Sequence, residues 1–430
     1  MSQTIKAGRL VIVDGVRTPF CRAGSEFAAL AADELGRVAV SALLLRTGLD
    51  PALIDEVIFG CVAQPAEATN IARVIALRAG IPQSVPAFTV QRNCASSCEA
   101  LTQAHEKLLA GRGSIFVVGG TESMSSIPLL FNASAAKKFG RLARAKSLWQ
   151  RAGAVAAFRP SDFKPRIGLL LGLTDPVCGL NMGETAEVLA REAGISRVAQ
   201  DEFALHSHQR AAAAREFLAG EICPVFRPRN DAVTQDNGIR ENQSLEALAK
   251  LKPQFDRKNG TVTAGNASQI TDGAVALLVM SEQRAQELGL VPLGALTGYA
   301  YAGCDPMRMG LGPLPAMIRA EKQTGLTLAD ADLIEINEAF AAQTLAVVKY
   351  AADGDYARKT LQRLLPVGEI PAAKLNVNGG SIALGHPVGS TGARLVLTAL
   401  RELKRRHARR ALVSLCVDGG QGAALWVERM

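Results

Sequence analysis

The chain has 430 residues, of which 48% are apolar and 20% are charged, a composition typical of a globular protein with two or three domains. Its net charge of +8 indicates attraction to something anionic, and nucleic acid, acidic lipid and a phosphorylated small molecule all fit that charge. The eight cysteines are scattered, which excludes a small secreted disulfide framework and repeated C-x-x-C zinc sites and favours reduced thiols.

The opening stretch, MSQTIKAGRLVIVDG, lacks the apolar run of a signal peptide, and no segment approaches the roughly 18 apolar residues of a membrane span. Homeodomain, zinc-finger and aromatic RNA-binding patterns are also missing, which argues against nucleic acid as the anionic partner. We therefore expect a soluble, cytoplasmic protein.

Short apolar segments alternate with longer helical patterns in the first part of the chain. Strands are predicted at residues 10–13, 57–62 and 115–118. The first of them is expected to end in a turn at Gly15. Alanine- and leucine-rich segments with helical periodicity lie at residues 28–47 and 99–109. Strands that alternate with helices predict a layered α/β fold with helices on the faces of the sheet.

The region 126–249 breaks this alternation. It begins with a basic amphipathic stretch, SAAKKFGRLARAKSLWQRAGAVAAF, which predicts a single helical segment, and it continues with proline-punctuated loops and further helical patterns. We predict that this region is an insertion in the first half of the fold, which then comprises residues 1–125 and 250–286.

The second half, residues 287–430, repeats the pattern of the first. ADLIEINEAF echoes IDEVIFGCVAQ as a buried strand after an acidic turn. ARRALVSLCVDGGQG echoes GRGSIFVVGGTES as a strand that runs into a glycine-rich loop. In each half, a loop and a helix that crosses the sheet are predicted between these two strands. Two similar halves predict a duplicated fold with a pseudo-twofold relation.

Two cysteines stand one helical turn apart in QRNCASSCEA, where an apolar helix is predicted to begin. Cys98 falls on the apolar stripe of that helix and is expected to pack in the core. Cys94 is placed in the first turn, where unsatisfied N–H groups and the helix dipole would lower the pKa of the thiol and favour a nucleophilic thiolate. A small buried apolar role is the equal alternative, whereas zinc is disfavoured because nothing nearby completes the ligand set.

A nucleophilic thiol needs a base, and the chain has five histidines. Four of them lie in helical or strongly cationic segments, where a structural or surface role is the ordinary interpretation. These four are His105, His206, His208 and His407. His386 lies in GGSIALGHPVGSTG, and glycine-rich backbone can approach a ligand closely. A histidine held in a loop by hydrogen bonds is its alternative interpretation.

Two further polar residues are predicted at the ends of strands in the second half. Cys416 ends the strand ALVSL, at the sheet edge where active sites of α/β proteins usually lie. Asn337 in INEAF leaves a strand likewise, and its amide could hold a substrate oxygen or a water. A buried strand cysteine and a turn-capping asparagine are the alternatives. The glycine clusters match neither nucleotide-binding fingerprint, so ATP and dinucleotide cofactors are not expected.

Taken together, these segments resemble the thiolase family, the acyl-CoA C-acyltransferases. The motifs that carry the resemblance are CASS, GNAS followed by DGA, NEAF, GGSIALGHPVGSTGAR and CVDGGQG, in the order of the family. The likeness extends from RTPF at residues 17–20 to the last motif, and therefore over essentially the whole chain. It implies a five-layered α-β-α-β-α core made of two similar halves, with a loop domain inserted in the first half.

The resemblance assigns roles to four residues. Cys94 matches the cysteine that becomes acylated, and His386 matches the histidine that activates it. Cys416 matches a second cysteine that acts as acid and base, and Asn337 matches a residue that holds an oxyanion-binding water together with the histidine. The implied reaction cleaves 3-ketoacyl-CoA with coenzyme A through an acyl-cysteine, and its reverse is a Claisen condensation.

The resemblance also implies contacts to the substrate. Ser268 in GNAS matches a contact to the pantetheine arm of coenzyme A, whereas Met182 and Phe340 match residues near the reacting acyl group. Coenzyme A is implied as a substrate, and no metal or permanently bound cofactor is implied.

Within the family, the long insertion and segments such as LNMGETAE and SHQRAAAA are most similar to the β subunit of the trifunctional complexes of fatty-acid β-oxidation. This similarity implies medium and long acyl chains, a homodimer or homotetramer, and a hydratase/dehydrogenase partner subunit. The basic stretch has an ordinary interpretation as a solvated face. Its functional alternatives are docking of coenzyme A phosphates, of a partner subunit or of a membrane surface.

Several residues depart from the family pattern. Ser97 replaces a usual glycine and is expected to crowd the start of the helix. Asp418 stands where small residues normally follow the second cysteine, so its carboxylate is expected to point away or to be paired. Asn337 is typical of ordinary thiolases rather than of trifunctional β subunits, and Asn181 replaces a histidine of many short-chain members.

Three rival functions follow. A biosynthetic acetoacetyl-CoA thiolase would act on four-carbon substrate alone, and a thiolase-like acyl-CoA or lipid-binding protein would lack turnover. A decarboxylating condensing enzyme is disfavoured because Cys416 stands where those relatives commonly have histidine.

Overall fold

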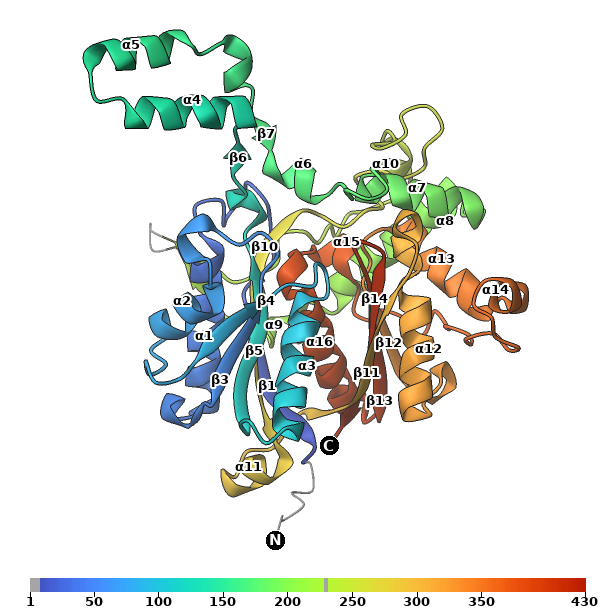
Figure 1. Ribbon diagram of the computed structural model, residues 1–430. Coiled ribbons are helices and arrows are strands. Elements are labelled where there is room, and N and C mark those ends of the chain that lie inside the picture. Colours follow the sequence, from blue (N-terminus) through green and yellow to red (C-terminus); the bar gives the residue numbers. More distant parts are fainter. Residues whose placement is uncertain (1–7, 228–230) are drawn as a thin grey trace. The chain divides into compact units, whose positions relative to one another are not determined.

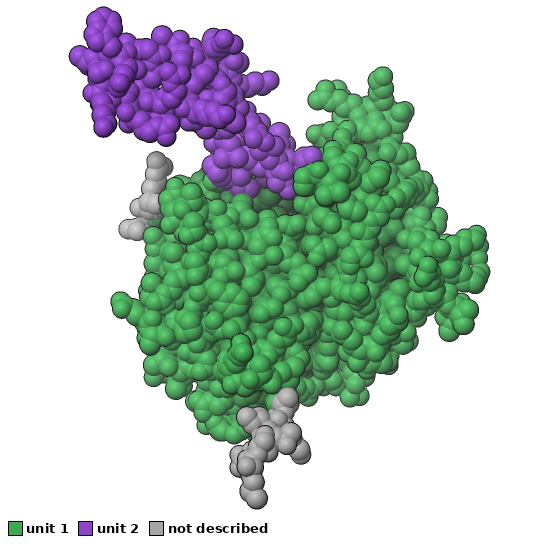
Figure 2. Space-filling model, in the orientation of Figure 1, with its two compact units in different colours: residues 1–126, 175–430 green, residues 127–174 purple. Residues whose placement is uncertain are grey.

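The computed structural model describes residues 8–227 and 231–430. The chain divides into two compact units, residues 1–126 with 175–430 and residues 127–174, coloured separately in Figure 2. Among the described residues, no helix is long and apolar enough to cross a membrane.

Unit 1 is built around a ten-stranded mixed sheet. Its strands follow the order β12-β13-β14-β11-β1-β10-β5-β3-β4, with β2 paired to β10. In the first half the strands are β1 (Leu10–Arg17), β2 (Cys21–Arg22), β3 (Glu56–Gly60), β4 (Ala87–Val90), β5 (Ile115–Glu122) and β10 (Thr271–Ser281). In the second half they are β11 (Gly294–Gly303), β12 (Leu333–Ile336), β13 (Arg410–Val417) and β14 (Gln421–Arg429).

The two halves repeat one topology, as predicted. In the order β3-β5-β10-β1 the first pair is parallel and the next two pairs are antiparallel. The order β12-β13-β14-β11 has the same sequence of parallel and antiparallel pairs. The equivalent strands β1 and β11 meet at Val11–Ala295 and Ile12–Gly294, which is the junction between the two halves.

Helices cover and separate the two halves of the sheet in five layers (Figure 1). One outer layer contains α1 (Ala32–Thr47) and α2 (Ile71–Arg78), and the other contains α12 (Pro313–Thr324) and α13 (Ala341–Ala352). The middle layer contains α3 (Ser96–Leu109) and α16 (Thr391–Arg406), which share a core with strands of both halves. The predicted α-β-α-β-α fold is therefore confirmed.

The remaining helices of unit 1 are shorter connections or lie near the strand ends. They are α7 (Met182–Glu192), α8 (Arg197–Ala213), α9 (Arg215–Ala219), α10 (Leu245–Ala249), α11 (Glu282–Glu287), α14 (Gly354–Lys359) and α15 (Ser381–Leu384). A short two-stranded sheet joins β8 (Val225–Phe226) to β9 (Ala232–Val233).

The prediction of a turn at Gly15 is wrong, because this residue lies inside β1 and pairs with Leu277. A Cβ at Gly15 would lie 2.5 Å from Leu277 Cδ2 and 2.7 Å from Leu397 Cδ1. The glycine therefore allows α16 to pack closely on the strand rather than bending the chain.

Unit 2, residues 127–174, is a helical hairpin on a two-stranded base. Its elements are β6 (Leu129–Leu130), α4 (Ala133–Arg144), α5 (Leu148–Ala156), β7 (Arg166–Ile167) and α6 (Gly168–Gly172). The predicted single basic helix is in fact two helices, because Ser147 caps α5 by accepting a hydrogen bond from Gln150 N and so starts a new helix. The aromatic rings of Phe131, Phe139, Phe158 and Phe163 pack on one another at centroid distances of 4.8 to 6.4 Å.

This unit is shorter than the predicted insertion of residues 126–249, because residues 175–249 pack within unit 1. In particular, α8 carries Ala211 in one core cluster with Ala383 and Leu384 of α15. Residues 175–249 therefore bring side chains close to the loop that contains His386.

Candidate active site

Cys94 lies just before α3 rather than in its first turn. The helix begins at Ser96 with Ala95 as its N-cap, and Asn93 on the other side of the cysteine has a left-handed φ of 42°. Ser96 Oγ fixes this turn, since it accepts a hydrogen bond from Arg92 N at 2.9 Å and donates one to Asn93 O at 2.7 Å.

The expectation of a lowered pKa at Cys94 is wrong for this structure. Burial of the thiol raises its pKa to about 12. A backbone hydrogen bond from Asp418 opposes the shift, while the negative charge of the Asp418 side chain adds to it. The thiol is therefore protonated near neutral pH and needs a base to become a nucleophile.

The first turns of α3 and α16 lie against each other in the middle layer (Figure 1). Ser97 Oγ accepts a hydrogen bond from Ala393 N at 2.9 Å, so the serine that replaces the usual glycine ties the two helices together instead of crowding them. Gly392 approaches Cys98 so closely that a Cβ there would lie 2.4 Å from the cysteine Sγ. Cys98 is fully buried in this core, as predicted.

Cys416 belongs to the second half of the fold and lies near Cys94. It is the penultimate residue of β13, is paired with Gly422 of β14 and is almost completely buried. Burial raises the pKa of its thiol, and negative charge on the nearby Cys94 sulfur raises it further. The strand end is tied to the turn that contains Cys94, because Asn93 Nδ2 donates a hydrogen bond to Asp418 O at 3.0 Å.

The expectation that the Asp418 carboxylate points away or is paired is not met. Its buried Oδ1 has no hydrogen-bond partner among the described residues, and its charge raises the pKa of both Cys94 and Cys416. Burial also raises the pKa of the Asp418 carboxyl itself. Because its pKa is raised, the carboxyl is neutral over a wider pH range. The neutral form does not repel negative charge at the two thiols.

His386 and Asn337 come together from two loops of the second half. Asn337 follows β12 directly, as predicted, and its Nδ2 lies 3.4 Å from His386 Nε2. The other ring nitrogen, Nδ1, lies 2.6 Å from Thr391 Oγ1. Burial, together with the charge of Arg394, lowers the pKa of His386 to about 3, so the imidazole is neutral near pH 7.

The backbone around His386 is fixed by the start of β10. His386 N donates to Gln269 O and to Thr271 Oγ1, both at 3.2 Å. Gly385 has a φ of +100°, and a Cβ there would lie 2.3 Å from Thr271 Oγ1. Glycine is therefore required at this position by conformation and by space.

The predicted substrate contacts lie on neighbouring segments. Ser268 N donates to Ala339 O at 2.9 Å, which places Ser268 beside the segment that contains Phe340. The Phe340 ring packs edge-on against Phe255 at 6.1 Å between centroids. Phe255 also contacts the start of α7 after Met182, where a Cβ on Gly183 would lie 2.2 Å from its ring.

Phe255 was missed by sequence reasoning because it lies in an irregular, proline- and charge-rich segment, PQFDRKNG, without periodicity. Ser381, Thr391 and Arg394 were also missed as site residues, although all three lie in the glycine-rich motif around His386. Their position within this motif was the only feature of the sequence that could have identified them.

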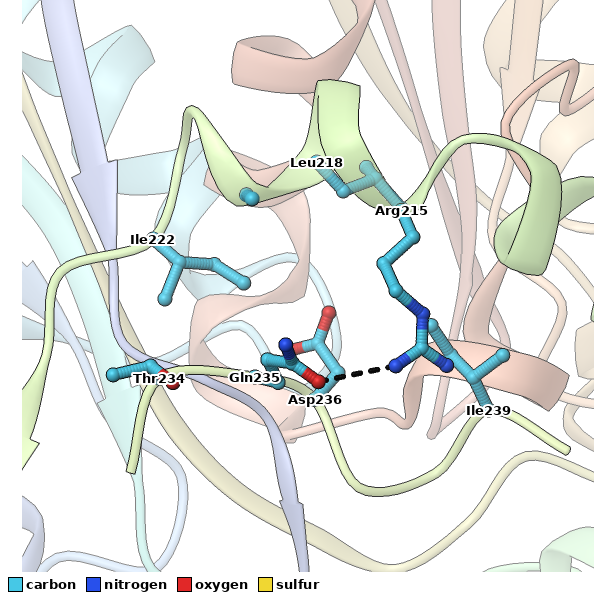
Figure 3. Close-up of a pocket in the computed structure, with 8 residues that line it drawn as sticks. Arg215, Leu218, Ile222, Thr234, Gln235, Asp236 and Ile239 are labelled. Atoms are coloured by element: carbon cyan, nitrogen blue, oxygen red, sulfur yellow. Dashed lines mark hydrogen bonds between the residues drawn. The ribbon is translucent and has the colours of Figure 1, made fainter. Parts of the chain in front are cut away.

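Other features of unit 1 do not converge on these residues. The cavity in Figure 3, of about 30 Å³, is lined mainly by residues of 215–222 and 234–239, and it has room for about one water molecule. Its Asp236 forms a buried ion pair with Arg17 at 2.7 Å. Among the described residues, no group of three His, Cys, Asp or Glu side chains has the arrangement of a metal site.

Comparisons with known proteins cover nearly the whole chain. Residues 10–283 match the family model described as the thiolase N-terminal domain, and residues 290–429 match the thiolase C-terminal domain. The chain is 42% identical to a 3-ketoacyl-CoA thiolase of Yersinia enterocolitica over 429 residues, covering 99% of this chain and 98% of that protein. It is 43% identical to a 3-ketoacyl-CoA thiolase of Serratia proteamaculans over 424 residues, covering 98% and 97%.

Solved structures give the same result. The acetyl-CoA acetyltransferase of Bacillus anthracis superposes with a TM-score of 0.84 at 36% identity, covering 98% of this chain and 99% of that one. Human mitochondrial 3-ketoacyl-CoA thiolase in complex with CoA also superposes with a TM-score of 0.84, at 35% identity, covering 99% and 98%.

Proposed function

Because this chain belongs to the thiolase family, we propose that it cleaves 3-ketoacyl-CoA with coenzyme A to acetyl-CoA and a shortened acyl-CoA. The residues proposed to carry the reaction are Cys94, His386, Cys416 and Asn337. The observation that carries this proposal is the approach of two thiols: the turn of Cys94, just before α3, is hydrogen-bonded through Asn93 to Asp418 after β13, and the Cys94 thiol raises the pKa of Cys416 near the end of that strand.

The first half-reaction acylates Cys94. Its sulfur attacks the 3-keto carbon while the thiol proton passes to neutral His386, because neither a free thiolate nor an imidazolium is favoured beforehand. The Nδ2–H of Asn337 supplies a hydrogen-bond donor for the developing oxyanion, directly or through a water. The bond between carbons 2 and 3 then breaks, and the Cys416 thiol protonates carbon 2 of the leaving acetyl-CoA enolate.

The second half-reaction releases the acyl group. The Cys416 thiolate takes the proton of the incoming coenzyme A thiol, whose sulfur attacks the thioester carbonyl on Cys94. Collapse of the tetrahedral intermediate expels the Cys94 sulfur, which recovers its proton from His386. Both cysteines end as thiols, so one turnover leaves the enzyme unchanged and requires no redox partner.

The substrate segment is proposed to be formed by Ser268, Met182 and Phe340, with Phe255 as the residue that joins the last two. Relatives named 3-ketoacyl-CoA thiolase support degradation of 3-ketoacyl-CoA as the physiological direction. Coenzyme A serves as a substrate, and no permanently bound group is proposed.

The test is the rate of coenzyme A-dependent loss of 3-ketoacyl-CoA with short, medium and long acyl chains. Turnover of medium and long chains supports the degradative proposal, whereas turnover of acetoacetyl-CoA alone would favour the biosynthetic alternative. Cys94→Ala should abolish turnover and still bind coenzyme A, while Cys178→Ala, which removes another partly exposed thiol, should retain it. Equal activity in the Cys94→Ala enzyme would refute the proposed nucleophile.

We propose that unit 2 docks reversibly on an anionic lipid surface. It holds nine of the 48 Lys and Arg residues and one of the 40 Asp and Glu residues, so its formal charge of +8 equals that of the entire chain. Each basic residue near an anionic bilayer contributes about 1 kcal/mol of attraction. Apolar side chains on α5, with Leu148 82% and Trp149 88% exposed, can enter the interfacial region.

Flotation with vesicles of phosphatidylcholine alone or with one third phosphatidylglycerol tests this docking. Binding only to the anionic vesicles, weakened by salt and by serine at Leu148 and Trp149, is expected. Serine at Leu364 and Val291, which are 88% and 83% exposed in unit 1, should leave binding unchanged. Binding to neither vesicle would refute lipid docking and favour a hydratase/dehydrogenase subunit as the occupant of this surface.

The remaining proposals concern organisation. We propose a cytoplasmic homodimer or homotetramer, to be tested by analytical ultracentrifugation. The division into halves at residues 1–125 with 250–286 and 287–430, with an insertion at 126–249 of which unit 2 is the separately compact part, is likewise proposed and is to be tested by limited proteolysis.

A further inference from the structure

Arg394 of α16 is a fully buried arginine with few partners. Its nearest carboxylate is Glu335, whose Oε2 lies 3.7 Å from Nη1. Its Nε and Nη1 have no hydrogen-bond partner among the described residues, and its Nη2 donates only to Ser381 Oγ at 3.1 Å. A buried guanidinium is costly unless it is paired and hydrogen-bonded, so this sparse arrangement calls for a role other than stability.

Hydrogen bonds run from Arg394 into the proposed active site with a defined direction. A guanidinium can only donate, so Ser381 Oγ accepts from Arg394 and uses its single proton to donate to Asn337 Oδ1 at 2.6 Å. With its oxygen held in this way, the Asn337 amide must turn its Nδ2–H group toward His386 Nε2.

The same direction continues through the imidazole. Nε2 faces a donor and must therefore be the unprotonated nitrogen, which places the ring proton on Nδ1. Nδ1–H then donates to Thr391 Oγ1 at 2.6 Å, and Thr391 Oγ1 donates to Pro387 O at 3.2 Å. Every proton in the chain from Arg394 to the Pro387 carbonyl points the same way.

We propose that Arg394 and Ser381 are positioning residues that hold His386 in the tautomer whose Nε2 can accept the Cys94 proton. This inference rests on the proposed function, in which that nitrogen is the base. When Nε2 takes the proton, it and the Asn337 amide become two donors, and both can then face one substrate oxygen. If the Asn337 amide were reversed, its oxygen would face the His386 ring and favour a proton on Nε2. This nitrogen could then no longer accept the Cys94 proton.

The test is the ¹⁵N spectrum of histidine-labelled protein at neutral pH, in which the ring nitrogens of five histidines must be resolved. Signals of His386 are identified by their loss in the His386→Gln protein. The wild type should show a protonated Nδ1 and an unprotonated Nε2. Ser381→Ala removes the hydroxyl between Arg394 and Asn337 and leaves Glu335 as the charge partner of the guanidinium. It should give a mixture of tautomers and lower kcat about tenfold, with KM changed less than twofold.

The control is Ser281→Ala, which also removes one buried serine hydroxyl, in this case one that accepts a hydrogen bond from Arg284 N. Ser281 ends β10, ten residues from Thr271 and therefore about 33 Å from the histidine loop. A protonated Nε2 in the wild type would overturn the inference, and so would an unchanged tautomer and kcat in Ser381→Ala. Failure of the wild type to catalyse thiolysis would refute the proposed function but would not alter the tautomer measurement.

Discussion

The contact between Gly392 and Cys98 sets how closely the two central helices approach each other, and adding one methyl group there should separate them. In Gly392→Ala the new Cβ would lie 2.4 Å from Cys98 Sγ, 3.0 Å from Cys98 N and 3.2 Å from Ser97 Oγ. Ordinary contacts lie at about 3.5 Å, so α16 must move away from α3 by about 1 Å.

Such a shift changes both stability and activity. Overpacking of this kind costs about 1–3 kcal/mol of unfolding free energy. The loop that carries His386 leads directly into α16, so a shift of about 1 Å relative to Cys94 should lower kcat by about 100-fold. Urea unfolding and steady-state thiolysis measure the two effects on the same preparations.

A double-mutant cycle identifies the contact responsible. Cys98→Ala alone should cost about 1 kcal/mol, but it removes the sulfur that limits Gly392→Ala and leaves the next contact, to Cys98 N at 3.0 Å, only about 0.5 Å too short. The double variant should therefore be more stable than the sum of the single effects by about 1–2 kcal/mol and should regain most of the lost kcat. Additive losses within about 0.5 kcal/mol would refute this account of the interface.

Three further predictions concern charge and the substrate segment. Asp418→Asn removes a charge that raises the pKa of Cys94, so alkylation by iodoacetamide should shift to lower pH; an unshifted profile would contradict this electrostatic contact. His386 has its pKa lowered from 6.5 to about 3 on folding, so the unfolded chain binds more protons between these values and stability falls by a few kcal/mol as the pH drops through this window. His386→Gln should flatten that decline in urea unfolding measured from pH 7 to pH 4, and an equally steep decline would assign it to other groups. Phe255→Ala removes the ring between Phe340 and α7, which should raise KM for acyl-CoA about tenfold with little change in kcat, whereas a pure loss of kcat would contradict a binding role.

Much of the fold was predictable because it depends on local patterns. The strands β12 and β13 are mainly apolar segments that end just before Asn337 and just after Cys416, and both residues lie at the strand ends where sequence reasoning placed them. Gly15 was misassigned to a turn because a glycine that makes room for a helix and one that bends the chain are identical in sequence.

The residues of the proposed site were named from the sequence, whereas their electrostatics were not predictable. The pKa of Cys94 depends on how deeply the chain buries the thiol and on Asp418, which is 324 positions away in sequence, and no local rule contains either effect. The hydrogen bonds of Arg394 and Ser381 were unpredicted for a related reason, because their direction follows from a geometry that exists only after β12 and α16 have packed together.

The junction between β1 and β11 divides the molecule so that neither half contains all four residues of the proposed mechanism. Cys94 comes from one half, whereas His386, Asn337 and Cys416 come from the other, and the exposed Val291 lies between them in the connecting segment. A chain cut at this point would yield two fragments that are individually inert. If mixing the fragments restores thiolysis, the dependence of the rate on fragment concentration would measure the affinity between the two halves.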